Sequence, residues 1–221
     1  MDNLTLIIPA KNESESLPKV LNELINYNLK TIVILEKKDL KTIDSIKNFN
    51  CKILYQVNKG YGDALILGIN NVETQFFCIF NADGSFDPKE LNQMYTQANN
   101  FGADFVFGSR YMNSASSEDD TLITFVGNKI FSMIGKIFFS LPISDILYTY
   151  VLGSTEKAKK LNLKQKSFSF CVELPIYAKR SQNNLISTPA NERARIAGVK
   201  KVNAFKDGFL ILISMIKIFF K

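Results

Sequence analysis

Short apolar runs alternate with helix-patterned segments along the first half of the chain, and this alternation restricts the possible fold more than any other feature. The runs are of strand length and almost continuously apolar, which is typical of sheets buried on both faces. We therefore expect an α/β fold, in which a mostly parallel sheet carries helices on both faces. The expected strands are 4–8, 31–35, 51–55, 76–80 and 104–107, and the expected helical segments are 16–29, 39–49 and 88–100.

Composition favours one core and an anionic partner. The 221-residue chain is 46% hydrophobic, which is enough for one sizeable core with an appendage. The formal net charge of +6 favours nucleotide phosphate, nucleic acid or an acidic lipid surface as the partner. Charge alone does not choose among these three.

Histidine and cysteine usage restricts the chemistry. The chain has no histidine, which excludes His-ligated zinc and Ser-His-Asp or Cys-His catalysis. Cys51, Cys78 and Cys171 are widely spaced and predict neither a metal cluster nor a disulfide framework, so a reducing, cytoplasmic compartment fits best. The N-terminus has no basic leader before its first apolar run, and we expect no secretory signal.

The apolar run 76–80 ends at a small polar cluster that contains Asp83 and Asp87, and Pro88 opens the next segment. Open α/β sheets place ligand chemistry at the carboxyl ends of buried strands. Mg²⁺ and Mn²⁺ prefer oxygen ligands and often share one or two carboxylates with substrate phosphates, so Asp83 is well placed to hold such a metal. The same residue types also make an ordinary turn before a capped helix, and this segment alone does not decide between the two interpretations.

A second candidate loop, 58–64 (NKGYGDA), lies between a strand and a helical segment. Its glycines allow a tight turn and a close approach to a ligand at a helix N-terminus. Leu65 stands where the dinucleotide fingerprint has its third glycine, and the loop is not a Walker P-loop. A plain connecting loop is the alternative.

Several motifs in register resemble a known family. The motifs of the first half are 8–13 (IPAKNE), 58–64, 81–84 (NADG) and 108–111 (GSRY). With these motifs, the sequence resembles the family 2 glycosyltransferases with the GT-A fold, and most closely the branch that includes dolichyl-phosphate mannosyltransferases and bacterial polyprenyl-phosphate sugar transferases. Later elements extend the resemblance over essentially the whole chain, namely Ser144-Asp145, Gly153-Ser154, Glu173, 195–201 and Asp207-Gly208.

The resemblance implies a donor site for a nucleoside diphosphate sugar. Asn12 and Glu13 match the nucleotide-pocket motif, and Asp83 matches the metal-binding aspartate of the Asp-x-Asp element, with Mg²⁺ or Mn²⁺ as the cofactor acting on the diphosphate. The donor-binding residues that the resemblance implies are Pro9, Asn12, Glu13, Glu36, Gly60, Asp63, Asn81, Asp83 and Arg110.

The resemblance also implies a basic element for phosphate. Arg195, with Lys200 and Lys201, matches a segment that closes over the donor phosphates or the acceptor phosphate, and a guanidinium fork suits that task. Without the resemblance, these would be interpreted as solvated surface charges. The expected catalytic residues are Asp83, Asp145 and Arg195.

Two positions depart from the family pattern. Most members carry an acidic pair after the second strand, whereas this chain has Glu36 followed by two lysines, so that Glu36 is the substitute ribose acceptor. Asn81 replaces the first aspartate of the Asp-x-Asp element, and an amide oxygen accepts hydrogen bonds without supplying charge. Metal affinity is then either weaker than in relatives or supported by Asp87.

The second half carries two apolar segments. Segment 122–141 follows a polar loop at 113–120, and we expect a core helix there rather than a membrane span, because Lys129, Lys136 and Pro142 interrupt it. The tail from Gly208 is shorter than a bilayer span and predicts an interfacial helix, with docking on the globular domain or a dimer contact as alternatives. We expect residues 1–205 to form the glycosyltransferase domain and 206–221 a C-terminal apolar helix.

The main hypothesis is an inverting, metal-dependent glycosyltransferase on the cytoplasmic membrane face, with a polyprenyl phosphate as acceptor and no nucleic acid partner. A phosphate acceptor is already anionic near neutral pH and needs little help from a general base. One alternative is transfer to a sugar hydroxyl in glycan assembly, which requires a base, with Asp145 the first candidate. Another is a binding subunit that keeps the fold without turnover.

Overall fold

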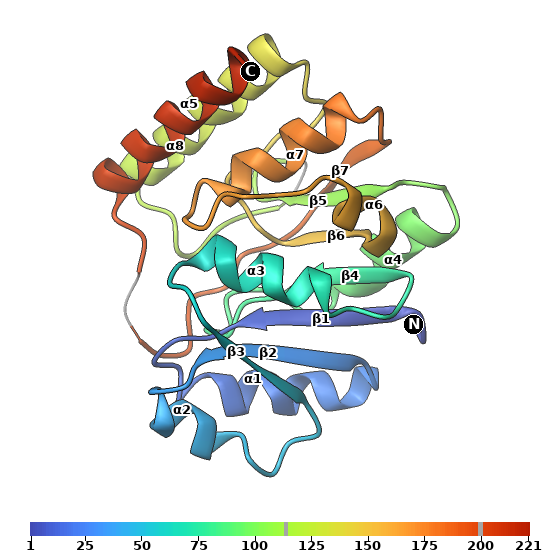
Figure 1. Ribbon diagram of the computed structural model, residues 1–221, viewed down its shortest axis with the longest axis vertical. Coiled ribbons are helices and arrows are strands. Elements are labelled where there is room, and N and C mark those ends of the chain that lie inside the picture. Colours follow the sequence, from blue (N-terminus) through green and yellow to red (C-terminus); the bar gives the residue numbers. More distant parts are fainter. Residues whose placement is uncertain (113–114, 199–200) are drawn as a thin grey trace.

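A seven-stranded sheet in the order β3-β2-β1-β4-β6-β5-β7 forms the centre of the molecule (Figure 1). The computed structural model describes residues 1–112, 115–198 and 201–221. Every neighbouring strand pair is parallel except those of β6, which runs antiparallel to β4 and β5. The prediction of a mostly parallel sheet is confirmed. The strands are β1 (Leu4–Pro9), β2 (Lys30–Glu36), β3 (Lys52–Gln56), β4 (Phe76–Ile79), β5 (Phe105–Ser109), β6 (Val151–Ser154) and β7 (Leu185–Pro189).

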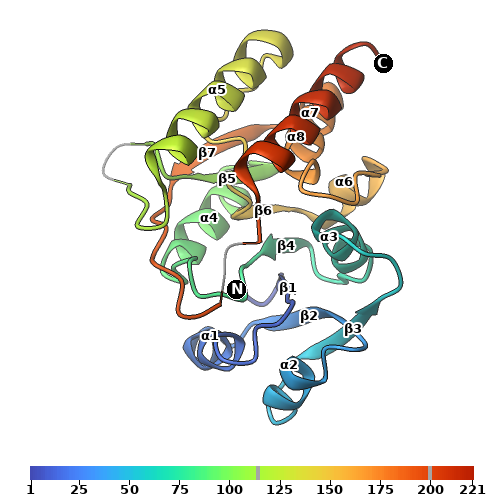
Figure 2. The same cartoon turned by 90° about the vertical axis from the view of Figure 1, so that its left-hand side faces the viewer.

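Helices cover both faces of this sheet (Figures 1 and 2). Buried residues of α1, α2's C-terminal end and α4 pack on one face, and those of α3, α6 and α7 pack on the other, with α8 outside α7. The helices are α1 (Leu17–Leu24), the short 3₁₀ helix η1 (Ile25–Tyr27), α2 (Leu40–Ser45), α3 (Tyr61–Asn70), α4 (Glu90–Asn99), α5 (Leu122–Phe139), α6 (Thr155–Lys160), α7 (Phe170–Arg180) and α8 (Ala204–Phe219).

The strand period divides the core into two layers. Successive side chains of a strand point to opposite faces, so that Ile7 belongs to the layer under α3 while Leu6 and Ile8 belong to the layer under α1. Because both faces are covered, the strands need apolar residues at almost every position, which is why the sequence shows continuous apolar runs.

The switch point of the sheet lies at β1. This strand is paired with β2 on one side and β4 on the other, and α1 and α3 lie on opposite faces. In open α/β sheets the crevice beyond the carboxyl ends of the strands at such a point is the place where ligands bind. The fold therefore directs attention to the residues that follow β1, β2 and β4.

Helix α5 contradicts the prediction of a core helix at 122–141. Its buried residues are Asn128, Ser132 and Gly135, whereas most of its large apolar side chains are exposed, Ile137 by 63%. The polar side chains on the buried face are satisfied, since Asn128 Nδ2 donates to Tyr111 Oη at 2.8 Å and Ser132 Oγ accepts from the Ile146 N–H at 3.1 Å. A segment that is apolar almost all round gives no periodic signal for the packed face, so the sequence could not show the inversion.

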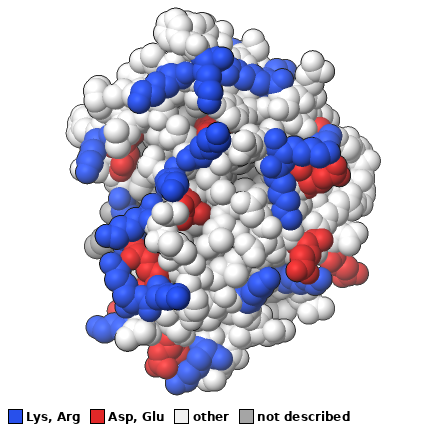
Figure 3. Space-filling model, viewed as in Figure 1, with Lys and Arg blue, Asp and Glu red and all other residues white. Residues whose placement is uncertain are grey.

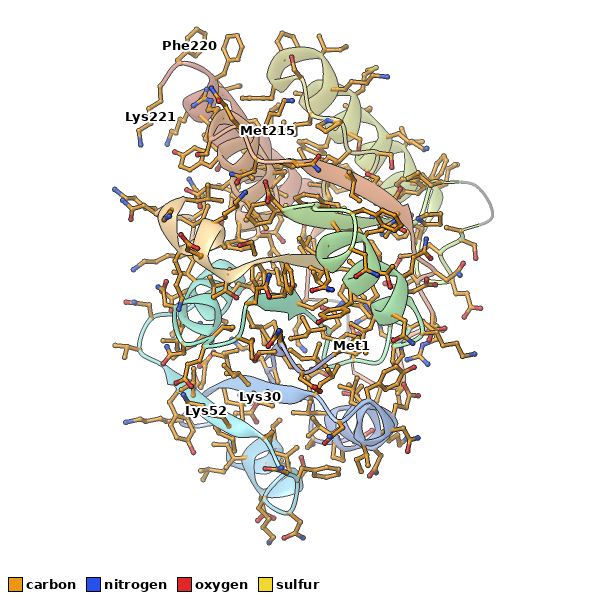
Figure 4. The ribbon with its side chains drawn as sticks, turned by 90° about the vertical axis from the view of Figure 1, so that its right-hand side faces the viewer. Met1, Lys30, Lys52, Met215, Phe220 and Lys221 are labelled. Carbon is orange, nitrogen blue, oxygen red and sulfur yellow. The ribbon has the colours of Figure 1, made fainter. Side chains whose placement is uncertain are left out.

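Helix α8 packs beside α5 and α7 at one end of the molecule (Figures 1 and 2). Ile211, Met215 and Ile218 are buried in this contact, and the Phe219 ring meets the rings of Phe138 and Phe139 edge-on at 5.9 Å. Lys and Arg side chains form a band across the same end of the molecule (Figure 3). Phe220 and Lys221 lie at the tip of α8 (Figure 4), and Phe220 is 82% exposed. The tail thus docks on the body with one face and exposes another.

Two glycines test how tightly the helices are packed. Replacing Gly62 in α3 with alanine would place a Cβ 2.1 Å from the Gln165 carbonyl oxygen, whereas a Cβ at Gly127 in α5 meets open space. We expect Gly62→Ala to lower the free energy of unfolding by about 1–3 kcal/mol through overpacking. The control Gly127→Ala should raise it by about 0.5–1 kcal/mol, because alanine is the better helix former. Urea denaturation measures both, and an equal effect of the two changes would contradict this packing.

Candidate active site

The carboxyl ends of β1, β2, β4 and β5 gather most of the expected site residues at one edge of the sheet. Asn12 and Glu13 follow β1, Glu36 ends β2, Asp83 follows β4, and Arg110 follows β5. Parallel strands bring residues that are far apart in the sequence to this common edge.

Asp83 lies in a tight turn that fixes one of its carboxylate oxygens. Asp83 Oδ1 accepts hydrogen bonds from the Ser85 backbone N–H at 3.0 Å and from Ser85 Oγ at 2.8 Å, and Asn81 Nδ2 donates to Ser85 Oγ at 3.1 Å. Gly84 in this turn has φ +84°, which a glycine adopts without strain. The turn packs on stacked aromatic rings, since the ring centroids of Phe86 and Tyr150 are 4.5 Å apart. Asp83 Oδ2 is left to face the site.

The segment after β7 lies across this turn and brings Arg195 to Asp83. The Arg193 N–H donates to the Ser85 carbonyl and the Ile196 N–H to the Asp83 carbonyl, both at 2.8 Å. Arg195 Nη1 lies 3.8 Å from Asp83 Oδ2. The expected catalytic pair is therefore brought together by backbone hydrogen bonds rather than by side-chain attraction alone.

Arg195 also binds a carboxylate from the loop that precedes α5. Its Nη2 donates to Asp119 Oδ2 at 2.9 Å and its Nε to Asp119 Oδ1 at 3.4 Å. Burial disfavours the charged guanidinium, but the hydrogen bonds from Arg195 to Asp119 and the nearby Asp83 raise its pKa on balance. The Asp119 carboxylate thus occupies the fork in which we expected a phosphate.

Glu13 is buried and already paired. It accepts a hydrogen bond from Ser16 Oγ at 2.6 Å, its backbone N–H donates to Thr42 Oγ1 at 3.0 Å, and Lys201 forms an ion pair with its carboxylate. The predicted phosphate residue Lys201 thus lies against the predicted nucleotide residue Glu13. Lys200 lies outside the described residues.

The Glu36 carboxylate forms ion pairs with two lysines at the rim of a hollow of about 310 Å³. Glu36 Oε1 lies 2.8 Å from Lys11 Nζ, and Glu36 Oε2 lies 3.1 Å from Lys38 Nζ. The hydrogen bonds from Lys11 and Lys38 lower the pKa of this carboxyl. The hollow is lined by Lys11, Asn12, Glu36, Lys38, Asp39, Leu40 and Lys41.

Packing explains why loop 58–64 contains glycine. Gly60 has φ +123°, and a Cβ there would lie 2.1 Å from the Lys166 carbonyl oxygen. Asp63 Oδ1 accepts from Asn58 Nδ2 at 3.1 Å, which closes the loop on itself. The glycines are thus needed for the approach of segment 165–167, and the geometry gives no separate reason to place Gly60 in a donor site.

Arg110 and Asp145 do not fit the roles expected of them. Arg110 Nε donates to Asp145 Oδ2 at 2.7 Å and Nη2 to Asp145 Oδ1 at 3.0 Å, while Nη1 donates to Glu192 Oε2 at 3.1 Å. Asp145 is completely buried, and Arg110 is 8% exposed. Asp145 therefore has no exposed oxygen to take a proton from an acceptor hydroxyl. The Arg110 guanidinium donates its hydrogen bonds to protein carboxylates and not to a donor phosphate.

Glu192 and Asp119 also belong to this site, although neither was expected from the sequence. Burial raises the pKa of the Glu192 carboxyl, although Arg110 beside it acts in the opposite direction. Both acids come from irregular segments, whose side-chain partners leave no periodic signal. The one available hint was the proximity of acidic residues at 118–120 to an apolar helix and of Glu192 to the basic run 193–195.

Asp83 is the residue of the site that fits a divalent metal. Within the described residues, no three His, Cys, Asp or Glu side chains are grouped to hold a metal by themselves. A single carboxylate oxygen facing the crevice is the arrangement in which Mg²⁺ or Mn²⁺ takes its remaining ligands from a substrate diphosphate and water. Asp87 Oδ1 accepts a hydrogen bond from the Lys89 backbone N–H at 3.0 Å, and the support that Asp87 was expected to give to the metal stays a prediction.

The family described as glycosyl transferase family 2 matches residues 5–161, which include β1 to β6 and most of the site. The chain belongs to glycosyl transferase family 2. The glycosyltransferase is thus an enzyme of the class that the motifs implied, and its matched region ends before Arg195.

Relatives of similar length support the same assignment. The glycosyltransferase is 26% identical over 226 residues to an uncharacterized protein of Methanocaldococcus jannaschii, which covers 97% of this chain and 93% of the relative. It is 26% identical over 235 residues to the UDP-N-acetylglucosamine–dolichyl-phosphate N-acetylglucosaminyltransferase of Methanococcus voltae, with 94% of each covered. An uncharacterized glycosyltransferase of Mycobacterium tuberculosis is 24% identical over 212 residues, covering 96% of this chain and 95% of the relative.

Solved structures show the fold. Glucosyl-3-phosphoglycerate synthase from Mycobacterium tuberculosis, in complex with Mn²⁺, UDP-glucose and phosphoglyceric acid, superposes with a TM-score of 0.78 at 11% identity. The match covers 98% of this chain and 79% of that one. The same enzyme was crystallised with Mg²⁺ and UDP, and that structure has a TM-score of 0.73. The predicted GT-A fold is confirmed.

The buried ion cluster gives a prediction for Asp145. Removing one partner of a buried pair leaves the other charge uncompensated, so Asp145→Ala should lower the free energy of unfolding by about 3–5 kcal/mol. The control Glu156→Ala breaks the exposed Glu156–Lys160 pair, which joins side chains 77% and 71% exposed, and should change stability little. Thermal and urea unfolding measure both. A stable Asp145→Ala protein that has lost only activity would restore the base hypothesis.

Proposed function

We propose that this glycosyltransferase moves a sugar from a nucleoside diphosphate sugar to a polyprenyl-phosphate-type lipid, in an inverting displacement at a membrane surface. One observation carries the proposal. Helix α5, with its exposed apolar side chains, begins at Leu122, three residues beyond Asp119, whose carboxylate is bound to Arg195 beside Asp83. A phosphate-binding centre and an apolar surface are thus joined by one short loop.

The donor fits the crevice beyond β1, β2 and β4. Asp83 would hold Mg²⁺ or Mn²⁺ together with the donor diphosphate, and the cation would neutralise the charge of the leaving group. Arg195 would bind the phosphates with its fork once Asp119 is displaced, and Glu36 and Asn12 would contact the nucleoside. Relatives support the donor class, since the Methanococcus voltae enzyme is named for a UDP-sugar.

A phosphate acceptor agrees with the state of the site carboxylates. A phosphate monoester is a nucleophile near neutral pH without a general base. Asp145, the expected base for a hydroxyl acceptor, is completely buried against Arg110. This burial favours the lipid-phosphate acceptor over a sugar hydroxyl. The Methanococcus voltae relative is named for a dolichyl-phosphate acceptor.

The outer faces of α5 and α8 would lie in a bilayer interface, and we define them together as the apolar end of the molecule. In the described part of the chain, α5 is the helix long and apolar enough to cross a membrane by length and composition. Its buried Asn128 and Ser132 instead tie it lengthwise to the body. The exposed side chains of the apolar end are Leu122, Ile123, Phe125, Val126, Ile130, Met133, Ile137 and Phe138 of α5, and Phe205, Phe209, Leu210, Ile216, Phe219 and Phe220 at α8.

Charge favours an anionic lipid surface as the occupant of this end. Lys129, Lys136, Lys206, Lys217 and Lys221 lie on or next to the two helices. A band of basic side chains crosses this end of the molecule (Figure 3). Lysine stems reach along apolar surface while their ammonium groups meet lipid headgroups, each adding about 1 kcal/mol near an anionic membrane. This charge supports the proposed peripheral position on the cytoplasmic membrane face.

Asp83→Asn tests the donor chemistry. This change should lower Mn²⁺-dependent donor turnover by a factor on the order of 10² or more, because it removes charge stabilisation that is concentrated in the transition state. The control Asp44→Asn, at an exposed carboxylate of α2 that pairs with Lys47, should leave turnover unchanged. Release of nucleoside diphosphate measures both. Normal turnover in Asp83→Asn would contradict the assignment of Asp83. If the unaltered protein itself shows no turnover, a binding subunit without catalysis would be favoured.

Charge introduced into the apolar end tests the membrane surface. The double variant Ile130→Glu/Ile137→Glu places two carboxylates among exposed apolar side chains of α5 and should weaken binding to anionic vesicles more than about tenfold. Donor hydrolysis by water should persist, because neither side chain touches the crevice.

The matched control changes two exposed apolar residues elsewhere. Ile25 and Phe101 are 62% and 75% exposed, and Ile25→Glu/Phe101→Glu should sediment with vesicles as well as the unaltered protein does. If the α5 variant also sediments normally, the apolar end is not the membrane contact.

A further inference from the structure

The contact between Asp119 and Arg195, which we call the latch, places a protein carboxylate in the arginine fork. Arg195 Nη2 and Nε donate to the two oxygens of Asp119 at 2.9 and 3.4 Å. The Arg195 and Asp119 side chains are 22% and 20% exposed, so a ligand in the crevice can reach the contact. Arginine binds carboxylate and phosphate through the same planar fork, and Asp119 therefore competes with any phosphate group that enters the site.

Hydrogen bonds between two segments position the latch. The Glu118 N–H donates to the Glu192 carbonyl oxygen at 2.9 Å, and the Ala194 N–H donates to Glu118 Oε2 at 3.0 Å. These bonds hold the segment before Asp119 beside the segment that leads to Arg195. A movement of the Asp119 side chain alone would thus open the fork without separating the two segments.

A continuous series of contacts leads from the latch to helix α5. Asp120 follows Asp119 in the chain, and its Oδ2 accepts from Tyr111 Oη at 2.6 Å. The Tyr111 ring in turn contacts two side chains of α5. Phe125 meets it edge-on with the ring centroids 5.3 Å apart, and Lys129 Nζ lies 4.3 Å from the ring centroid. The position of the first turns of α5 is therefore coupled to the segment that carries the latch.

We propose that the latch closes the phosphate site of the free enzyme and that docking on an anionic membrane opens it. This inference rests on the proposed function and adds a regulation to it. An anionic lipid surface offers hydrocarbon to Phe125 and headgroup phosphates to Lys129, and both compete with the Tyr111 ring. Loss of these ring contacts would allow Tyr111 and Asp120 to shift, and Asp119 with them. The membrane thus has the higher affinity for the open state that a shift of populations requires.

The latch would also protect the donor. A nucleoside diphosphate sugar that is bound in solution is exposed to hydrolysis by water, and a closed active site limits such side reactions. An enzyme whose phosphate site opens at the membrane binds its donor firmly where the lipid acceptor is present.

Binding of inorganic pyrophosphate to the full chain tests the latch, because pyrophosphate supplies the phosphate chemistry without a nucleoside. Equilibrium dialysis with excess Mg²⁺ measures its affinity with and without vesicles of phosphatidylglycerol and phosphatidylcholine. Asp119→Asn keeps the shape of the side chain and removes its charge, so without vesicles it should bind pyrophosphate about tenfold more tightly than the unaltered protein. The matched control Glu118→Gln removes the same charge one residue away and should change the affinity less than about twofold.

Vesicles and further variants test the release of the latch. The unaltered protein should gain about tenfold in pyrophosphate affinity on vesicles, whereas Asp119→Asn should gain little because its latch is already open. In an Arg195→Ala protein, Asp119→Asn should bring no gain, because the partner of the latch is absent. Lys129→Met should respond less to vesicles than Lys136→Met, which removes the same charge two turns further along α5.

The outcomes separate this inference from the proposed function. Equal gains in Asp119→Asn and Glu118→Gln would show a general effect of charge and overturn the latch. A protein that sediments with vesicles but keeps its pyrophosphate affinity would overturn the release by the membrane, and equal responses of the two lysine variants would overturn the route through Tyr111. If no variant binds pyrophosphate, or if the unaltered protein does not sediment, the proposed function itself is wrong and the inference falls with it.

Discussion

The buried guanidinium of Arg110 is the interaction on which the geometry of the site depends. A charge with so little exposure is tolerated only when it is paired and hydrogen-bonded, and Asp145 and Glu192 together occupy its fork. These partners come from the segment before β6 and from the segment after β7. One side chain therefore ties β5 to the chain that continues to Arg195, and the backbone hydrogen bonds to the Asp83 turn complete the connection.

The same cluster links the site to the apolar end. Asp120 Oδ2 accepts from Tyr111 Oη at 2.6 Å, and Tyr111 Oη accepts from Asn128 of α5 at 2.8 Å. The polar face of α5 is thus used to hold the helix against the body, which leaves its apolar face outward. For a soluble protein this arrangement would be costly, because exposed apolar patches of this kind promote association. For the lipid acceptor that we propose, it would place the apolar surface of α5 three residues from Asp119, whose carboxylate is bound to Arg195.

Much of the fold followed from the sequence, while the site followed only in part. The apolar runs predicted β1 to β5 because both sheet faces are covered. The strands β6 and β7 were not predicted, because they are only four and five residues long and include Gly, Ser, Thr and Pro. Asp83 and Arg195 were predicted from motifs, and the structure places them 3.8 Å apart. Arg110 and Asp145 were predicted as donor and catalytic residues, yet the structure buries them against each other. The position of a residue in a motif determines which strand end it follows. The burial of its side chain depends on segments that are distant in the sequence and pack against it.

The sequence by itself determined the class of fold, the edge of the sheet that carries the chemistry and the exclusion of histidine-based mechanisms, because periodicity and composition act locally. Tertiary structure alone decided which face of α5 is buried, that Asp119 occupies the fork of Arg195, and that Lys11 and Lys38 meet on Glu36. Each of these contacts joins side chains whose positions depend on how separate segments pack. A polar or apolar side chain has the same chemistry wherever it stands, but its partner is chosen by the packing of the whole chain.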